Sequence, residues 1–381
     1  MDCGRHNAPV TRCRIAANSS PRKVVRILLR WFAAHARDLP WRRTRDPYSI
    51  WISEVMLQQT QVATVIPYYE RWLRSLPTVC ALATAAPQRV LKLWEGLGYY
   101  TRARNLHAAA RHIVAQRDGR FPDALDELLK LPGVGRYTAG AVASIAFNQP
   151  APILDGNVTR VLTRLHGIAE DPRGKMTSAR LWQLAQGLVS VAAEPNPVPR
   201  IRGMVLSGSC SALNQSLMEL GALVCTPRAP RCGECPLRGF CVAHRTGRAG
   251  ELPCAAPRAR VVQKRVVAFV LERRGRFLLR QRPAGGVNAG LWEFPTAELS
   301  GNRTPAAAAR SQFGAATEVE PLIVLRHSIT SQRISLHAVR VHCNGDAVLP
   351  AGRWCTGKAL RTLPLARAHR RVAERLSATP A

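Results

Sequence analysis

Four cysteines in one short segment form the residue set with the most specific chemistry in the chain. Cys225, Cys232, Cys235 and Cys241 have six, two and five residues between them. Four thiolates on one loop can complete a metal centre without ligands from elsewhere in the fold. Zinc more often shows two Cys-x-x-Cys pairs, whereas one central pair with wider outer ligands favours a cubane 4Fe–4S cluster. The other cysteines of the eleven are scattered, so we expect reduced thiols and a cytoplasmic protein.

Two carboxylates stand in segments where an acid or an anion could take part in catalysis. Glu54 lies in the apolar segment from Ile50 to Val65, which we expect to be one helix with Gln58 and Gln61 on the same face. A carboxyl group held in apolar surroundings has a raised pKa and can act as a general acid near neutrality. Asp155 directly precedes a predicted helix, where its ordinary role is an N-cap. An ion-paired glutamate and a capping aspartate are the structural alternatives.

A glycine-rich turn lies about twenty residues before Asp155. The segment from Leu131 to Thr138 places Gly133 and Gly135 in a turn, and a helix of small residues follows. Without Cβ atoms the two glycines let a backbone approach a phosphate closely, and the free N–H groups at the helix start can bind it. The turn therefore predicts a nucleic-acid phosphate site, with an ordinary helix–helix turn as the alternative.

The charge of the chain indicates a polyanionic partner. The 381 residues carry a formal net charge of +31, so nucleic acid is the favoured ligand and binding should weaken steeply with salt. A membrane surface is the competing polyanion, but the basic residues are not gathered on one amphipathic helix and no stretch is apolar enough to span a bilayer. Residues 1–22 lack the apolar core of a secretory signal; a transit peptide is a weaker alternative to a basic tail there.

Hydrophobic periodicity divides the chain into an all-α part and an α+β part. Helical spacing of apolar residues persists to about residue 245, and short apolar runs that predict strands follow, beginning with a hairpin that turns at Arg273-Arg274-Gly275. Residues 194–211 are expected to be a surface insertion. The predicted segments are a disordered basic tail (1–22), an all-α domain (23–245), a linker (246–261), an α+β domain (262–370) and a tail (371–381).

The glycine-rich turn resembles the helix-hairpin-helix of the base-excision DNA glycosylases. Together with Leu154-Asp155-Gly156-Asn157-Val158, and with the segment from Ser53 to Val62, it is similar to the MutY family, which removes adenine opposite 8-oxoguanine. The resemblance extends from about Val24 to Leu365, and the cysteine spacing matches the cluster loop of the same superfamily. It implies an all-α helix-hairpin-helix glycosylase domain with an iron-sulfur cluster loop, followed by a smaller α+β Nudix-like domain.

The resemblance also assigns roles to individual residues. Hydrolysis of a purine N-glycosidic bond needs an acid for the departing base and an anion beside the cationic sugar. The family pattern implies that Glu54 protonates adenine at N7, that Asp155 stabilises or traps the sugar cation, and that Tyr137 and Asn157 orient them. The implied DNA contacts are Gln58, Gln59, Tyr99, Gly133, Gly135 and Arg42. Gln59 and Tyr99 would enter the duplex when the base leaves the stack. For Arg42 and Tyr99 a purely structural role is the alternative.

The C-terminal part resembles the Nudix-like module of the same family, notably over Leu279–Pro283 and Gly290–Pro295. Nudix hydrolases cluster glutamates on a following helix to hold Mg²⁺. In this chain the next acids after Glu298 are Glu318 and Glu320, so we expect this domain to read a lesion without hydrolysing a nucleotide.

The segment expected to read 8-oxoguanine departs from its family. The family pattern is Arg-His-x-Phe-Ser-His, whereas this chain has Arg326-His327-Ser328-Ile329-Thr330-Ser331. Thr330 keeps a hydroxyl that can hydrogen-bond the edge of the base, but Ile329 replaces a ring and Ser331 replaces an imidazole. We therefore expect 8-oxoguanine to be preferred over guanine by a smaller margin than in relatives with the full pattern.

The predicted activity is that of a monofunctional adenine DNA glycosylase. Its predicted partner is double-stranded DNA with adenine opposite 8-oxoguanine or guanine, and it would act as a monomer at the bacterial nucleoid. An endonuclease III-like glycosylase with lyase activity needs a lysine one residue after the hairpin arginine, where this chain has Tyr137. A non-catalytic iron–sulfur DNA-binding protein is the second alternative, and it is disfavoured because Glu54 and Asp155 both stand in their motifs.

Overall fold

The computed structural model describes residues 20–254, 261–314, 317–329, 331–342 and 349–378, which divide into two compact units. The first holds the described residues of Met1–Trp51, Asp123–Lys130 and Val134–Ala256, and the second those of Ile52–Pro122, Leu131–Gly133 and Pro257–Ala381. These units do not coincide with the predicted domains, since residues 52–122 group with the C-terminal part, and the domain boundaries stay a prediction. None of the described helices is long and apolar enough to cross a membrane.

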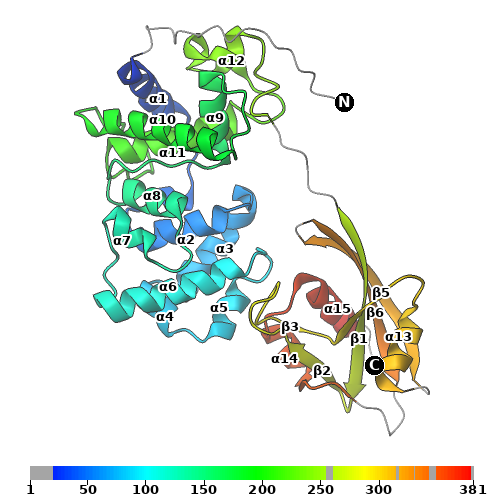
Figure 1. Ribbon diagram of the computed structural model, residues 1–381. Coiled ribbons are helices and arrows are strands. Elements are labelled where there is room, and N and C mark those ends of the chain that lie inside the picture. Colours follow the sequence, from blue (N-terminus) through cyan, green and yellow to red (C-terminus); the bar gives the residue numbers. More distant parts are fainter. Residues whose placement is uncertain (1–19, 255–260, 315–316, 330, 343–348, 379–381) are drawn as a thin grey trace. The chain divides into compact units, whose positions relative to one another are not determined.

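The first unit is helical (Figure 1). Its helices are α1 (Pro21–His35), η1 (Pro40–Arg42), α7 (Leu125–Leu129), α8 (Arg136–Ile145), α9 (Gly156–His166), α10 (Lys175–Ala193), α11 (Ser209–Leu223), η2 (Cys232–Glu234), η3 (Arg238–Phe240) and α12 (Val242–Arg245). Helices α1, α9, α10 and α11 share the main core. In α1 the buried residues Val25, Leu28 and Phe32 have the three- and four-residue spacing of one helix face, which explains why this segment is helical.

The second unit begins with helices and ends with a sheet. Helix α2 (Pro47–Leu57) crosses into it from the first unit, and α3 (Val62–Ser75), α4 (Val79–Thr84), α5 (Pro87–Leu93) and α6 (Thr101–Arg117) follow. Trp72 of α3 and Trp94, which directly follows α5, are fully buried and meet edge to face with ring centroids 5.5 Å apart. This aromatic pair fixes the start of the loop between α5 and α6.

The sheet has the strand order β3-β2-β1-β6-β5, with β4 paired to β1 and β7 to β2. Its strands are β1 (Val262–Arg273), β2 (Arg276–Gln281), β3 (Trp292–Glu293), β4 (Thr296–Glu298), β5 (Glu318–Ile329), β6 (Gln332–His342) and β7 (Arg353–Thr356). Strands β1 and β6 are parallel, and the β1–β2 and β5–β6 pairs are antiparallel. Both Arg274 and Gly275 have positive φ, as a tight hairpin turn requires, so the predicted hairpin is confirmed.

Alternate residues of β1 pack against helices on opposite faces of the sheet. Val267 and Phe269 share a core with α13 (Pro305–Phe313), whereas Ala268 and Val270 share one with α14 (Gly357–Thr362) and α15 (Arg367–Ala378). Because side chains alternate along a strand, a strand that is covered on both faces appears in the sequence as a continuous apolar run. The all-α part followed by an α+β part agrees with the predicted fold class.

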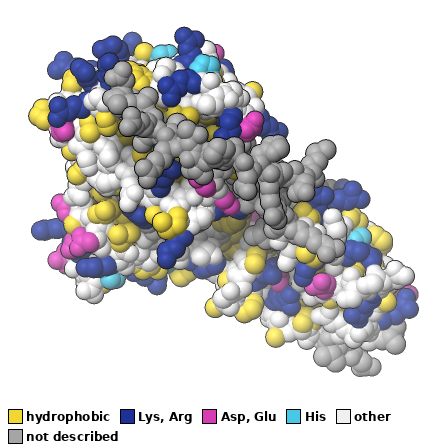
Figure 2. Space-filling model, turned by 45° about the horizontal axis from the view of Figure 1, so that its top comes forward, with side chains coloured by type: hydrophobic (Ala, Val, Ile, Leu, Met, Phe, Trp, Pro, Cys, Tyr) yellow, Lys and Arg dark blue, Asp and Glu magenta, His cyan; other side chains and the backbone are white. Residues whose placement is uncertain are grey.

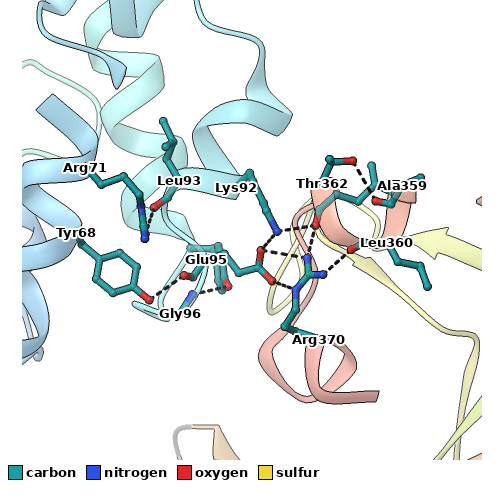
Figure 3. A network of polar contacts seen from close by, with 12 residues as sticks. Tyr68, Arg71, Lys92, Leu93, Glu95, Gly96, Ala359, Leu360, Thr362 and Arg370 are labelled. Atoms are coloured by element: carbon teal, nitrogen blue, oxygen red, sulfur yellow. Dashed lines mark hydrogen bonds and ion pairs between the residues drawn. The ribbon is translucent and has the colours of Figure 1, made fainter. Parts of the chain in front are cut away.

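Within the second unit a partly buried carboxylate joins two helical segments (Figure 3). Glu95 accepts hydrogen bonds from Lys92 Nζ and Arg370 Nε, both at 2.6 Å, and Arg370 Nη2 also donates to the Leu363 carbonyl at 2.6 Å. Burial lowers the pKa of Lys92, and Glu95 opposes that change. The contacts hold α15 and the turn after α5 in one polar network.

One predicted helix is in fact two. Helix α2 ends at Leu57, and Gln61 is the N-cap of α3, so Gln58 and Gln61 do not extend the face of Glu54 as predicted. Gln59 between them adopts a left-handed conformation with φ of 56°, which no α-helix accommodates. The apolar periodicity continues across this turn because α3 also packs on the core.

The two predicted tails are also partly wrong. Helix α1 begins at Pro21, inside the predicted tail 1–22, because a proline is well tolerated in the first turn of a helix. Residues 371–378 belong to α15, where Val372 and Ala373 are 1% and 3% exposed in the sheet core. These two apolar residues form the inward side of an otherwise charged helix.

Candidate functional site

The carboxylate of Asp155 is held by two donors at the start of α9. Its Oδ1 accepts a hydrogen bond from the Val158 backbone N–H at 2.7 Å, and its Oδ2 accepts one from Asn157 Nδ2 at 2.9 Å. Burial raises the pKa of Asp155, and these donors oppose the rise. Asp155 is therefore the predicted N-cap, and it also presents a desolvated anion whose orientation is fixed.

Asn157 connects this carboxylate to the cysteine segment. Its Oδ1 accepts a hydrogen bond from Arg160 Nη2 at 2.8 Å, and Arg160 Nε donates to the Cys225 carbonyl at 2.6 Å. Arg160 Nη2 also donates to the Gly221 carbonyl at 2.8 Å, and Nη1 donates to the Gly156 carbonyl at 3.2 Å. Each nitrogen of this almost completely buried guanidinium therefore has a hydrogen-bond acceptor. The predicted orienting role of Asn157 has a direct geometric basis.

The predicted phosphate turn lies between α7 and α8. Gly133 has φ of 72°, and a Cβ on it would meet the Asn105 side chain at 2.3 Å. Gly135 is the N-cap of α8 and a Cβ there would meet nothing within 4 Å, so the start of this helix is open. Gly133 is therefore required for packing against Asn105, whereas the open space at Gly135 agrees with a helix start that an anion can approach; phosphate binding by this turn stays a prediction.

Helix α8 packs unusually close to the segment that leads to Asp155. A Cβ on Gly140 would lie 2.3 Å from the Pro152 carbonyl oxygen, so only glycine fits. Tyr137 of α8 is partly buried, and its hydroxyl lies 3.9 Å from the Met218 sulfur. The role of Gly140 was not predicted, and a glycine within a small-residue helix was the only signal for it in the sequence.

Glu54 lies in the most deeply buried part of α2. It is 4% exposed, and its neighbours Ser53 and Val55 are 0% and 5% exposed. Four residues earlier, Ile50 belongs to a buried cluster with Ile153, which precedes Asp155 by two residues. The predicted acid is therefore buried, and its role as an acid stays a prediction.

The predicted inserted residues are the tips of two turns. Gln59 is exposed and Tyr99 is 51% exposed, and their φ angles of 56° and 47° are both left-handed. Tyr100, by contrast, is 5% exposed, and burial raises its pKa to about 12. Of the two adjacent tyrosines only Tyr99 is available to a ligand, and Gln58 is partly buried.

The predicted DNA contact of Arg42 is not supported. Arg42 is 7% exposed, and its Nη1 and Nη2 donate to Glu219 at 3.1 and 3.0 Å. Arg37 binds the same carboxylate through Nε and Nη2. Glu219 lies 177 residues from Arg42 in the chain, so spacing gave no signal for the pair. Arg42 joins η1 to α11 and has a structural role in this arrangement.

The four cysteines lie together on the loop after α11. All four are partly buried, and η2 and η3 provide the tight turns between Cys232, Cys235 and Cys241. Burial raises the pKa of Cys235 to about 11; a backbone hydrogen bond at Leu237 opposes the rise, and the neighbouring thiols add to it. Arg164 of α9 donates to Cys225 Sγ at 3.3 Å.

A buried arginine of α9 holds this loop in place. Arg164, 2% exposed, also donates to the carbonyls of Thr226, Pro227 and Leu252, and so fixes the loop from the side of α9.

Comparison with known proteins places these features in one family. Family models match the HhH-GPD superfamily of base excision DNA repair proteins over residues 52–186, the iron–sulfur binding domain of endonuclease III over 225–241, and the NUDIX domain over 266–375. An adenine DNA glycosylase of Rattus norvegicus is 37% identical, over 91% of this chain and 76% of its own length. The chain belongs to the adenine DNA glycosylase family.

A second adenine DNA glycosylase and a solved structure of another DNA glycosylase are also similar to the chain. An adenine DNA glycosylase of Mus musculus is 39% identical, over 71% of this chain and 60% of its own length. A solved structure of a thermostable thymine-DNA glycosylase is 31% identical with a TM-score of 0.51, and covers 59% of this chain and 97% of that chain. The predicted glycosylase fold, iron–sulfur loop and Nudix-like domain are thereby confirmed as features of an adenine DNA glycosylase family member.

The residues predicted to read the lesion lie at the β5–β6 connection, and that role stays a prediction. Thr330 lies outside the described residues, and Ser331 accepts a hydrogen bond from the Val262 N–H through its carbonyl at 2.9 Å. Ile329 is the last residue of β5. Behind it, Nδ1 of His327 is buried without a hydrogen-bond partner among the described residues, and burial lowers the pKa of this imidazole.

Proposed function

We propose that the chain removes adenine opposite 8-oxoguanine or guanine from double-stranded DNA by hydrolysing the N-glycosidic bond. The observation that carries this proposal is the partly buried carboxylate of Asp155, which Val158 and Asn157 orient within the family's Leu-Asp-Gly-Asn-Val motif. The chain spans 76% of the length of the rat relative and 60% of the length of the mouse relative. Because these relatives are longer, the substrate is proposed from the residues of this chain.

In the proposed reaction two carboxylates have different tasks. The Glu54 carboxyl group donates a proton to adenine N7, so the base departs as a neutral molecule rather than an anion. The bond to the sugar breaks, and the Asp155 carboxylate stabilises the positive charge that develops there until water adds to that carbon and gives up a proton to the Glu54 carboxylate left by the first step. Glu54 is buried and Asp155 is partly buried, which strengthens these interactions because solvent screens them less.

Before this reaction the adenine must leave the base stack, which costs a few kcal/mol. We propose that Gln59 and Tyr99 enter the duplex and occupy the space that the base vacates. Their exposure supports this role, and so does their position at the tips of turns. Gly133 and Gly135 would hold the phosphate backbone, and exposed Arg228 and Arg238 of the cysteine loop would add to binding.

The surface charge supports a nucleic-acid partner. Figure 2 shows Lys and Arg side chains in several groups over the drawn face, with few Asp and Glu side chains between them. Such a surface attracts the DNA backbone without specifying sequence, so specificity has to come from the base pocket and from the lesion-reading segment. We propose that the chain acts as a monomer in the bacterial cytoplasm, at the nucleoid.

A single-turnover excision assay tests the proposal. Three duplexes carry adenine opposite 8-oxoguanine, guanine or thymine, and a fourth carries thymine opposite guanine. The fourth tests for thymine release, because one similar structure is that of a thymine-DNA glycosylase. We expect adenine release from the first two and an intact abasic strand that alkali later cleaves, because Tyr137 stands where a lyase needs lysine. No adenine release from any duplex would refute the proposal.

A further inference from the structure

Arg102 of α6 binds both turns that carry the exposed tips Gln59 and Tyr99. Its Nη1 donates to the carbonyls of Val55, Met56 and Gln58 at 2.8, 3.0 and 2.7 Å. These are carbonyls at and beyond the end of α2, which have no partner within the helix itself. The guanidinium therefore caps the C-terminus of α2 from a distant part of the chain.

The other terminal nitrogen of the same guanidinium binds the second turn. Arg102 Nη2 donates to the carbonyls of Leu97 and Gly98 at 3.2 and 3.1 Å, and contacts Thr60 Oγ1 at 3.4 Å. The guanidinium carbon also lies 5.2 Å from the Trp94 ring and 5.6 Å from the Tyr99 ring. One planar group thus joins the backbone before Gln59 and the Thr60 hydroxyl after it to the backbone just before Tyr99.

Burying the charged guanidinium of Arg102 costs free energy, which its hydrogen bonds to carbonyls have to offset. Its side chain is largely enclosed, and burial lowers its pKa to about 10, with the nearby Tyr99 acting in the opposite direction. In the described part of the chain no carboxylate forms an ion pair with it. Its charge is balanced by carbonyl dipoles, which a forked guanidinium can bind together and a lysine ammonium cannot.

We infer that Arg102 is a positioning residue that sets the distance and orientation of Gln59 and Tyr99, so that both enter the duplex as one unit when the base leaves the stack. The inference rests on the proposed function, because it assigns these tips to base extrusion. Their left-handed backbones would otherwise be free to relax into commoner conformations. A displacement of about 1 Å at such a site can reduce the rate about 10²-fold.

The test uses the full chain with its cluster and a duplex that carries 2-aminopurine beside the target adenine, whose fluorescence rises when stacking is broken. Arg102→Lys should slow this rise and single-turnover excision by about 10- to 10²-fold, while affinity for undamaged duplex changes less than about twofold. The matched control is Arg111→Lys on the same helix, where the arginine donates to the Ala83 carbonyl at 3.2 Å. It should leave both rates unchanged.

A double-mutant cycle separates positioning from a general structural role. In a Gln59→Ala, Tyr99→Ala background, Arg102→Lys should reduce extrusion by less than about a further twofold, because its effect acts through the missing side chains. A full additional loss would overturn the inference, as would normal extrusion by Arg102→Lys alone. If Arg102→Lys does not unfold cooperatively, Gly98→Ala replaces it, since φ of 72° strains alanine there without filling occupied space. Normal extrusion by that variant would also overturn the inference, whereas failure of the wild type to release adenine would refute only the proposed function.

Discussion

Substitution of the buried Glu219 tests whether Arg42 has a structural role. Glu219 is 1% exposed and accepts hydrogen bonds from Arg37 and Arg42. Burial by itself would raise the pKa of this carboxyl group above 4.5, but the two arginines lower it to about 2. Each unit of difference between the folded and unfolded pKa is worth about 1.4 kcal/mol. The difference at Glu219 therefore adds about 3 kcal/mol to the free energy of unfolding at neutral pH.

Because the folded-state pKa lies below the unfolded value, this contribution is complete above the unfolded pKa and is lost as the pH falls toward the folded one. Glu219→Gln should therefore lower the free energy of unfolding by about 3 kcal/mol at neutral pH, and by progressively less between about pH 5 and pH 2. Urea unfolding of both cluster-containing proteins at several pH values measures the difference.

An exposed ion pair supplies the control. Arg22 and Glu194 are 69% and 43% exposed, and Glu194→Gln should lower the free energy of unfolding by less than about 1 kcal/mol. Arg42→Gln should destabilise the protein as Glu219→Gln does and leave the salt dependence of DNA binding unchanged. A stable Arg42→Gln variant whose logarithmic salt slope falls by about one would show that Arg42 contacts a phosphate, and would refute this reasoning.

Three further predictions concern the chemistry. Asp155→Asn should reduce single-turnover adenine release by about 10²-fold or more without weakening duplex binding, because the anion acts on the transition state; an undiminished rate would place the chemistry elsewhere. The wild type should be brown, with about four irons and four sulfides per chain. Cys232→Ala should lose the colour and the control Cys80→Ala should keep it. Stoichiometric zinc without sulfide would contradict the cluster. Ile329→Phe combined with Ser331→His should widen the preference for 8-oxoguanine over guanine by about tenfold, and an unchanged ratio of excision rates would mean that the base is read elsewhere.

Local patterns in the sequence predicted the parts of the site that depend on neighbouring residues. The spacing of the cysteines, the cap at Asp155 and the turn at Arg274-Gly275 each lie within a few residues, and each is governed by local geometry or ligand chemistry. The burial of Glu54 followed from the apolar composition of its own helix.

Arginines that pair across long distances could not be predicted in the same way. Arg42 binds a carboxylate 177 residues away, and Arg102 binds carbonyls about 45 residues away, so no spacing rule connects the partners. The end of α2 was missed for the same reason, since Arg102 satisfies its last carbonyls in place of a glycine cap. Arg160 and Arg164 did leave a signal, because they stand four residues apart on the buried side of α9.

Through Arg164, the folded cysteine loop protects the segment before Leu252 from proteolysis. This guanidinium holds Cys225 on one side and the Leu252 carbonyl on the other, and Leu252 is 1% exposed. Arg248, four residues earlier, is a tryptic site whose N–H is engaged with the Ala243 carbonyl. Disruption of the loop would remove the partners of Arg164 and open this segment to trypsin before the helical core unfolds. Cleavage there would then report on the state of the cluster through the integrity of the backbone.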